Sequence, residues 1–359
     1  MSGFGMTAQP SPDQLVPLPP TADGISSLAW SPTANLLAAG NWDGTVRLWD
    51  CQVQPPSMPN SQAMWQVQPK AESTTPGGPV LDIAFSGDGS TLFAGSNDNK
   101  VYMWQVASGN TMQQIGVHDA PVRSVCFAAA NNWVVSGSWD KTIKFWDCRS
   151  PTPVGQFQLP ERVYSMSCVG NVLAVALAAR KIVVYTLNGS PQQQLEMESP
   201  LKYQTRTISV FPDQSGFAVG SIEGRCHIHY FQQKPGFAEN FAFRCHREEN
   251  ATKTISTVHS VNSIPFHPFG TFATVGGDGV INFWDKDSKQ RLKLFTPCGD
   301  TISAAAFNAQ GNIFAYAKSY EWNKGHEGYQ GAGVAKNEIY LHYTPEEEIK
   351  QRAKKAGKR

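Results

Sequence analysis

Short apolar segments recur along the chain, alternate with polar neighbours, and close with an aromatic residue. The two clearest copies span residues 25–50 and 122–147. Each has a short apolar segment, a turn, a second apolar segment ending in Gly or Ser, an acidic turn, and an alternating segment ending in Trp. In the first copy Val46 and Leu48 alternate with polar residues, the period of two expected of a half-buried strand. The pattern therefore predicts β-strands throughout the repeat.

Seven copies align when the closing residue is used as the anchor: Trp49, Trp104, Trp146, Tyr185, His229, Trp284 and His342. Five copies carry an acidic residue six positions earlier: Asp43, Asp98, Asp140, Glu223 and Asp278. Ala179 and Lys336 replace it in the other two copies. The Asp-Gly pairs at 43–44 and 278–279 indicate tight hairpin turns. We interpret the acidic residues as structural turn residues, because they occupy equivalent positions in separate copies.

This unit resembles the WD repeat, in which each copy forms a four-stranded blade. One blade cannot bury its own apolar face, whereas a closed ring of blades can. The sequence therefore predicts an all-β protein, a seven-bladed WD-repeat β-propeller spanning residues 14–343. In such repeats the turn Asp typically bonds to a His before the innermost strand. His118 fits that position in the third blade and His246 in the sixth.

The two ends of the ring need a join. Residues 14–18 form an apolar–polar run that contains Pro17, and we expect them to form the outer strand of the seventh blade, an edge position that tolerates proline. Three segments fall outside the repeats. We expect residues 1–13 to form a flexible arm and 51–78, rich in Pro, Ser and Gln, to form a mobile loop inserted between the first two blades. The third is a charged tail, 344–359, for which two interpretations stay open: a solubilising end, or a basic segment for nuclear targeting or RNA contact.

Composition narrows the class of protein. The 30 basic and 29 acidic residues nearly balance, so a nucleic-acid contact requires a local basic patch. The seven cysteines are scattered, without a C-x-x-C pair, which favours a reducing, intracellular location. The start of the chain lacks the features of a signal peptide, and the longest apolar run, 172–179, is too short to span a bilayer.

Catalytic and metal-binding patterns are weak. Cys226 and His227 are neighbours on a predicted strand and point to opposite faces, so they do not favour one metal ion. The turn carboxylates Asp43, Asp98, Asp140 and Asp278 have a structural explanation. We therefore expect no enzyme activity, no metal and no cofactor.

Two deviations from the bare repeat indicate recognition surfaces. Arg225 follows an acidic turn in the fifth copy and can bond a partner's carboxylate, or else form an ion pair with an acidic neighbour in the adjacent blade. In the sixth copy Trp284 precedes a basic stretch, which suits phosphate or an acidic peptide or is an ordinary solvated strand. Its cations are Lys286, Lys289, Arg291 and Lys293. We expect the two surfaces to lie at opposite ends of their strands and to serve two ligands.

Several motifs outside the generic repeat resemble one family, the Rae/Gle-type nuclear mRNA export factors of the nuclear pore. They are LPERVY (159–164), SPLKYQTR (199–206), SIEGR (221–225), FRCHR (243–247), WDKD (284–287) and GNIFAYAKSYEWNKGHE (311–327). The resemblance implies a propeller that captures the GLEBS hairpin of a phenylalanine-glycine-repeat nucleoporin as a heterodimer and associates with poly(A) RNA. It assigns Arg225 and Phe243 to the peptide, and Trp284, Lys286, Lys289 and Arg291 to an RNA groove. The segment 51–78 is not part of the family pattern.

Some of these motifs also fit an alternative function. The related mitotic-checkpoint WD-repeat adaptor, which binds GLEBS motifs in checkpoint kinases, shares the motifs around 201–206, 221–225 and 245–247. The motifs WDKD, LPER and SYEWNKGHE instead resemble the export factor, which implies a nuclear and nuclear-pore location with shuttling to the cytoplasm. A propeller enzyme is a second alternative, and no convergent polar set supports it.

Overall fold

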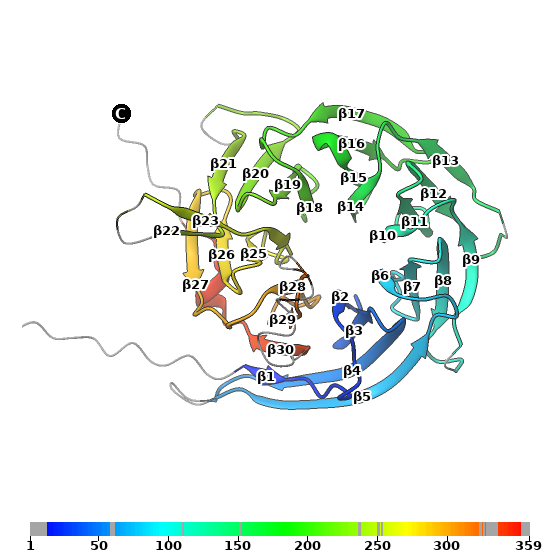
Figure 1. The fold of residues 1–359 in the computed structure, drawn as a ribbon, viewed down its shortest axis with the longest axis horizontal. Coiled ribbons are helices and arrows are strands. Elements are labelled where there is room, and N and C mark those ends of the chain that lie inside the picture. Colours follow the sequence, from blue (N-terminus) through cyan, green and yellow to red (C-terminus); the bar gives the residue numbers. More distant parts are fainter. Residues whose placement is uncertain are drawn as a thin grey trace, which may run out of the picture.

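Seven four-stranded antiparallel sheets surround a central axis and form a disc (Figure 1). The computed structural model describes residues 13–57, 62–109, 111–150, 152–235, 238–249, 252, 254–322, 325, 327 and 337–352. The predicted seven-bladed β-propeller is confirmed. Within these ranges no helix is both long and apolar enough to cross a membrane.

The first three blades follow one another in chain order. Blade 1 has β2 (Ile25–Trp30), β3 (Leu36–Asn41), β4 (Thr45–Gln54) and β5 (Met64–Thr74). Blade 2 has β6 (Val80–Phe85), β7 (Thr91–Ser96), β8 (Lys100–Gln105) and β9 (Gln113–Val117). Blade 3 has β10 (Val122–Ala128), β11 (Trp133–Ser138), β12 (Thr142–Trp146) and β13 (Gly155–Gln158).

The next three blades repeat this order. Blade 4 has β14 (Val163–Val169), β15 (Val172–Leu177), β16 (Lys181–Thr186) and β17 (Gln192–Glu198), with a 3-10 turn η1 (Ala178–Arg180). Blade 5 has β18 (Thr205–Val210), β19 (Gly216–Ser221), β20 (Arg225–Tyr230) and β21 (Phe241–Arg244). Blade 6 has β24 (Val261–Ser263), β25 (Phe272–Gly276), β26 (Ile281–Asp285) and β27 (Gln290–Leu294).

The last blade joins the two ends of the chain. Blade 7 combines β28 (Ile302–Phe307), β29 (Ile313–Lys318) and β30 (Glu338–Tyr343) with the N-terminal strand β1 (Gln14–Leu15). A separate two-stranded hairpin, β22 (Arg247–Glu249) and β23 (Ser256–Val258), connects blades 5 and 6. The short helix α2 (Glu346–Ile349) follows blade 7.

Strand register supports the alignment made from sequence. In every blade the anchor residue of the third strand pairs with an apolar residue of the second strand. The pairs are Leu37↔Trp49, Leu92↔Trp104, Val134↔Trp146, Leu173↔Tyr185, Phe217↔His229, Phe272↔Trp284 and Phe314↔His342. The two histidines and the tyrosine therefore occupy the place of the Trp in the other blades.

The acidic turns are held in different ways. In blade 3, His118 Nδ1 lies 2.9 Å from Asp140 Oδ2, and its Nε2 lies 2.7 Å from Ser136 Oγ. In blade 6, His246 Nδ1 lies 2.8 Å from Asp278 Oδ1. Where the His is missing, other donors replace it. Arg47 donates to Asp43 at 2.9 Å, and the Tyr102 hydroxyl donates to Asp98 at 2.5 Å.

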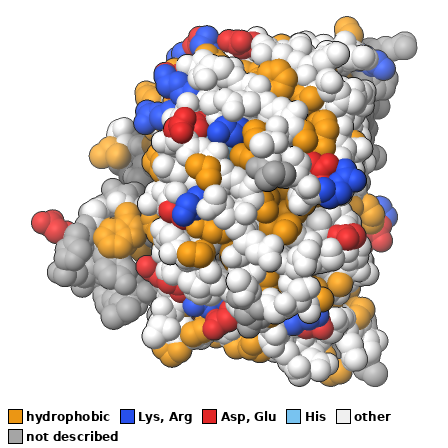
Figure 2. Space-filling view, turned by 90° about the vertical axis from the view of Figure 1, so that its right-hand side faces the viewer, with side chains coloured by type: hydrophobic (Ala, Val, Ile, Leu, Met, Phe, Trp, Pro, Cys, Tyr) orange, Lys and Arg blue, Asp and Glu red, His pale blue; other side chains and the backbone are white. Residues whose placement is uncertain are grey.

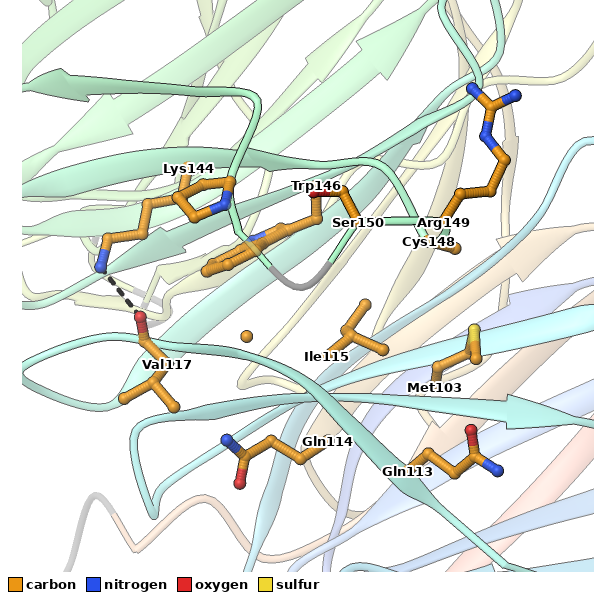
Figure 3. Close-up of a pocket in the computed structure, with 12 residues that line it drawn as sticks. Met103, Gln113, Gln114, Ile115, Val117, Lys144, Trp146, Cys148, Arg149 and Ser150 are labelled. Atoms are coloured by element: carbon orange, nitrogen blue, oxygen red, sulfur yellow. Dashed lines mark hydrogen bonds between the residues drawn. The ribbon is translucent and has the colours of Figure 1, made fainter.

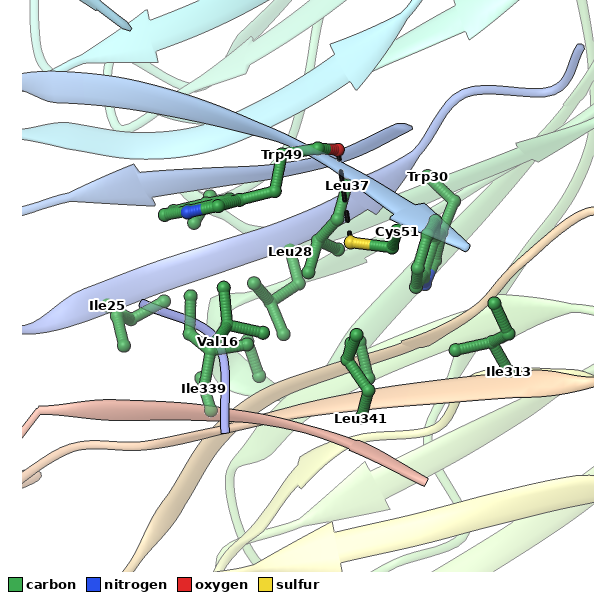
Figure 4. Packing of buried hydrophobic residues seen from close by; sticks show 14 residues of the cluster. Val16, Ile25, Leu28, Trp30, Leu37, Trp49, Cys51, Ile313, Ile339 and Leu341 are labelled. Carbon is green, nitrogen blue, oxygen red and sulfur yellow. Dashed lines mark hydrogen bonds between the residues drawn. The ribbon is translucent and has the colours of Figure 1, made fainter. Parts of the chain in front are cut away.

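Ring closure uses the N-terminal strand that the sequence predicts. Gln14 pairs with Leu341, Leu15 with Tyr340, and the Val16 amide donates to Ile339 O. Val16 is 1% exposed and belongs to an apolar cluster that mixes residues of blades 1 and 7 (Figure 4). Burying one such side chain contributes about 1.5–3 kcal/mol, so Val16, which directly follows β1, helps to hold that short strand on blade 7.

The expectation of a loop at 51–78 is wrong for most of the segment. β4 continues to Gln54 and pairs over ten residues with β5, so the segment supplies the outer strand of blade 1 (Figure 1). Trp65 and Val67 pack against the apolar cluster shared by blades 1 and 7, whereas Met64 is exposed. This alternation is the strand signal that the prolines obscured, and Pro69 is tolerated because β5 is an edge strand.

The tail also differs from expectation, because its first half packs on the propeller. Ile349 is 1% exposed within the apolar cluster of blades 6 and 7. The Arg352 amide donates to Asp285 Oδ2 at 2.9 Å. One apolar residue therefore anchors a segment whose sequence is otherwise charged. Residues 353–359, with most of the predicted basic stretch, and residues 1–12 of the predicted arm lie outside the described residues.

We predict that His118→Ala lowers the free energy of unfolding by about 2–4 kcal/mol, because it removes a buried group with three hydrogen-bonding neighbours. The third neighbour is Thr142, whose hydroxyl lies 3.0 Å from His118 Nδ1. Urea denaturation measures the change. Gln113→Ala, at an exposed position of β9, is the control, and equal stability of the two variants would contradict a structural role for the histidine.

A histidine between two carboxylates connects the two ends of the chain at the closure of the ring. His342 Nδ1 lies 2.8 Å from Asp13 Oδ1 and Nε2 lies 2.9 Å from Glu348 Oε2, and Lys293 also contacts Glu348. Burial lowers the pKa of His342, but the hydrogen bonds to Asp13 and Glu348 outweigh it, so the pKa lies above its usual value. Each ring nitrogen donates to a carboxylate, as an imidazolium does.

We therefore predict that stability falls as the pH rises above about 6.5, the usual histidine pKa. A raised folded-state pKa stabilises the fold fully below the unfolded value, and that stabilisation is lost as the pH rises through the folded value. Urea unfolding of the wild type and His342→Gln between pH 6 and 9 measures this. The wild type should lose more stability than the variant over that range, and parallel curves would argue against this role of His342.

Candidate functional site between the fifth and sixth blades

One residue assigned to the peptide and one assigned to the RNA groove meet at the seam between blades 5 and 6. Phe243 lies in β21 and Trp284 in β26, and their ring centroids are 4.6 Å apart. The Trp284 indole donates to Thr274 Oγ1 at 2.9 Å, which fixes the ring. Phe243, which the resemblance assigns to the peptide, therefore lies in the sheet beside Trp284, which it assigns to the RNA groove.

Arg225 begins β20, directly after the turn of blade 5. Gly224 has a φ of +65° there, a conformation that suits glycine. The Arg225 Nε lies 3.6 Å from Glu223 Oε2, and its side chain is 33% exposed. Its ion pair is therefore within the turn, not with an adjacent blade. The other carboxylate oxygen of Glu223 is buried without a hydrogen-bond partner in the described part of the chain.

Lys286 is not an accessible cation, which corrects the expectation from sequence. Its side chain is only 4% exposed, and its ammonium lies 3.2 Å from both oxygens of Asp287. The ammonium also lies over the rings of Phe211 and Tyr230, at 5.1 and 5.6 Å. Since both rings come from blade 5, Lys286 holds the two blades together and is already neutralised.

Lys289 and Arg291 remain accessible, each over an aromatic ring. The Lys289 ammonium lies 5.1 Å from the centroid of Phe241 and 3.3 Å from Glu239 Oε2. The Arg291 guanidinium lies 5.9 Å from the centroid of Trp284. Lys293, by contrast, is paired with Glu348. Of the four cations in this stretch, two are therefore available to a ligand.

Sequence reasoning missed Phe241. It lies two residues before Phe243 on the same face of β21, with 6.0 Å between ring centroids. The F-x-F spacing on a strand is the signal that could have identified it, because residues two apart share a face. Together Phe241, Phe243, Trp284, Lys289 and Arg291 form what we call the aromatic–basic row. It offers stacking faces and two cations along one blade seam.

Away from the aromatic–basic row, a hollow of about 550 Å³ lies at the rim between blades 2 and 3 (Figure 3). Its cations are engaged within the protein, since Lys144 donates to Val117 O at 2.8 Å and Arg149 pairs with Asp147 at 2.6 Å. Basic and acidic side chains intermix over this side of the disc (Figure 2). Neither of these two cations lies over an aromatic ring of the described residues, in contrast to Lys289 and Arg291 in the aromatic–basic row.

Among the described residues, no three His, Cys, Asp or Glu side chains converge to hold a metal ion. Cys226 packs in the apolar cluster between blades 5 and 6. His227, its neighbour, is buried, and neither ring nitrogen has a hydrogen-bond partner in the described part of the chain. Burial lowers the pKa of His227 to about 4, and the neighbouring His229 adds to this effect.

Comparison with known proteins shows which repeat and which fold the chain shares with them. A WD domain, G-beta repeat model matches residues 15–50, 70–105, 109–147 and 251–285. The crystal structure of the WD40 β-propeller domain of Doa1 covers 94% of this chain and 98% of that chain, with a TM-score of 0.68 at 16% identity. At this identity the likeness supports the fold alone.

Three curated relatives are much closer in sequence. The chain is 44% identical to the poly(A)+ RNA export protein of Schizosaccharomyces pombe, covering 94% of this chain and 92% of that protein. It is 41% identical to Protein Rae1 of Drosophila melanogaster (90% and 91%) and 42% identical to the mRNA export factor GLE2 of Chaetomium thermophilum (86% and 85%). With these relatives and this fold, the chain belongs to the Rae1/Gle2 family of WD-repeat mRNA export factors.

Proposed function

We propose that this protein is a non-enzymatic adaptor of mRNA export, which binds the GLEBS hairpin of a phenylalanine-glycine-repeat nucleoporin and associates with poly(A) RNA or messenger ribonucleoprotein. The observation that carries the proposal is membership of the export-factor family over most of the chain. The aromatic–basic row supports it, since it combines stacking faces with accessible cations on a rigid sheet.

The contact with the hairpin rests on Arg225. Its ion pair to Glu223 is 3.6 Å long, and a third of the side chain is exposed. A partner's carboxylate can therefore replace or join Glu223 and form a charge-assisted bond with the guanidinium. Phe243 contributes one ring of a tilted aromatic pair at the seam between blades 5 and 6, the kind of apolar contact that anchors an interface beside a charged one.

The RNA contact rests on Trp284, Lys289 and Arg291. Aromatic rings stack with bases irrespective of sequence, and nearby cations neutralise phosphates. Lys286 has a supporting role in this proposal, because its buried ammonium holds Asp287 and the rings of blade 5 in place. A heterodimer with a nucleoporin would place the protein in the nucleus and at the nuclear pore, shuttling to the cytoplasm with its cargo.

We predict that Arg225→Glu abolishes binding of a synthetic GLEBS hairpin in calorimetry and leaves the melting temperature within about 2 °C of wild type. The reversed charge repels the acidic partner, and the long, partly exposed ion pair of Arg225 with Glu223 contributes little stability. Arg149→Glu at the far rim is the control and should bind normally. Wild-type affinity of Arg225→Glu would exclude this residue from the contact. In a pull-down from nuclear extract with the tagged wild-type protein, capture of checkpoint kinases in place of a pore component would favour the checkpoint adaptor.

Reversal of both accessible cations, in Lys289→Glu/Arg291→Glu, should weaken binding to a 15-nucleotide oligo(A). The slope of log affinity against log salt should fall by roughly 0.7 for each phosphate that the protein no longer neutralises. Fluorescence anisotropy over a salt series measures both quantities, with Lys144→Glu/Arg149→Glu as the matched control. An unchanged slope would show that RNA binds elsewhere.

A further inference from the structure

The hollow at the rim between blades 2 and 3 is not used by the proposed function, and its floor is apolar (Figure 3). Met103 of β8 and Ile115 of β9 line it, and both are partly buried against the apolar cluster that blades 2 and 3 share. The indole of Trp146, in β12, lies so close to Gly116 that a Cβ there would be 2.6 Å from the ring. The hollow therefore offers apolar side chains on a tightly packed seam between two blades.

The outer strand of blade 2 forms one wall of this hollow. All five residues of β9 line it. β9 is the last strand of its sheet, and no strand in the described part of the chain pairs with its other side. The Lys144 ammonium, which also lines the hollow, donates to Val117 O of this strand at 2.8 Å. The backbone of β9 is therefore accessible from the hollow, where an extended chain can pair with it.

β9 lacks the residues that usually protect an edge strand from pairing with another chain. Such strands carry charged side chains, particularly lysine, or proline. β5, the outer strand of blade 1, contains Pro69 and Lys70, whereas the sequence of β9 is Gln-Gln-Ile-Gly-Val. An edge strand without charge and without proline can accept an added strand.

Charge indicates which kind of segment fits the hollow. Two cations, Lys144 and Arg149, are among the described residues that line it, and none of those residues is acidic. Lys144 donates to a neutral carbonyl and so keeps its positive charge. The Arg149 side chain is 82% exposed, so its ion pair with Asp147 contributes little. An acidic residue of a partner can therefore form a charge-assisted bond with either cation.

A nucleic-acid strand fits this hollow less well than a peptide does. Base stacking requires an accessible aromatic face, but Trp146 is only 3% exposed, and its indole donates to Ser136 Oγ at 2.7 Å. A peptide in extended conformation instead meets an unpaired strand edge, an apolar floor and two cations. These three features together favour a peptide.

We propose that this rim is a peptide-binding site, in which an extended acidic segment of a partner adds as a fifth strand to the outer edge of β9. One apolar side chain of the segment lies on Met103 and Ile115, and an Asp or Glu binds Lys144 or Arg149. Neither Arg225 nor any residue of the aromatic–basic row lines this hollow. The site therefore lets the adaptor hold a further partner while the proposed hairpin and RNA sites are occupied.

Phage selection with a depletion step tests this site. A random 12-residue peptide library is depleted on Lys144→Glu/Arg149→Glu and then selected on the immobilised full-length wild type, so that peptides needing the two cations remain. Enriched peptides should carry Asp or Glu beside aliphatic or aromatic residues. In fluorescence anisotropy, a labelled selected peptide should bind at least about tenfold more weakly to Ile115→Ser, because this variant loses part of the apolar floor.

A change in the peptide tests strand addition on the unaltered protein. An analogue of the selected peptide with alternate backbone nitrogens methylated cannot donate hydrogen bonds to β9. It should also bind at least about tenfold more weakly to the wild type, since main-chain hydrogen bonds supply much of the affinity in strand addition. This measurement does not depend on whether Ile115→Ser folds.

Lys70→Glu and Val154→Ser are the matched controls, since both residues are exposed and lie outside the hollow. Arg225→Glu should bind the selected peptide as the wild type does, which separates this site from the proposed hairpin site. Three results would overturn the proposal: no peptide enriched after depletion, equal binding to Ile115→Ser, or undiminished binding of the methylated analogue. Weaker binding of a 15-nucleotide oligo(A) to the double variant used for depletion would also overturn it, by identifying the rim as an RNA contact.

Discussion

The pairing of the first strand with the last blade is the constraint on which the rest of the structure depends. Every other blade is built from neighbouring segments, but blade 7 takes β1 from the opposite end of the chain. Loop-closure entropy grows slowly with length, by only about 0.6 kcal/mol for each doubling. The burial of Val16 and the hydrogen bonds of His342 to Asp13 and Glu348 are therefore large enough to offset the extra length. The outer strand β5 adds Trp65 and Val67 to the same cluster.

Closure creates two kinds of surface, one at the seams between blades and one at the central axis. At the seams, side chains of adjacent blades meet, as Phe243 of blade 5 meets Trp284 of blade 6. At the axis, the innermost strands bring Arg123 and Arg206 into one cavity. Neither surface exists within a single repeat. An open stack of the same blades would leave the apolar seams exposed and the channel unformed.

The distribution of charge decides which of these surfaces is available. Most cations near the candidate sites have partners: Lys286 is buried with Asp287, Lys293 is bound to Glu348, and Arg206 to Glu321. The arginines and lysines without a strong partner are thus few in this region. They are Arg225, Arg291 and Lys289 at blades 5 and 6, and the ion pair of Lys289 with Glu239 is exposed and therefore weak. A near-neutral protein therefore presents local positive charge at defined places.

The sequence by itself determined the repeat, the number of blades, the anchor position in each blade and the use of His118 and His246 at the acidic turns. These features follow from local alternation and fixed spacing, which any copy of the repeat displays. Only the tertiary structure decided that Lys286 is buried, that Phe243 lies beside Trp284, and that residues 64–74 form a strand. Exposure of a lysine depends on rings contributed by another blade, and the strand at 64–74 is held by apolar residues of blades 1 and 7. Such contacts join residues far apart in the chain, so no local pattern records them.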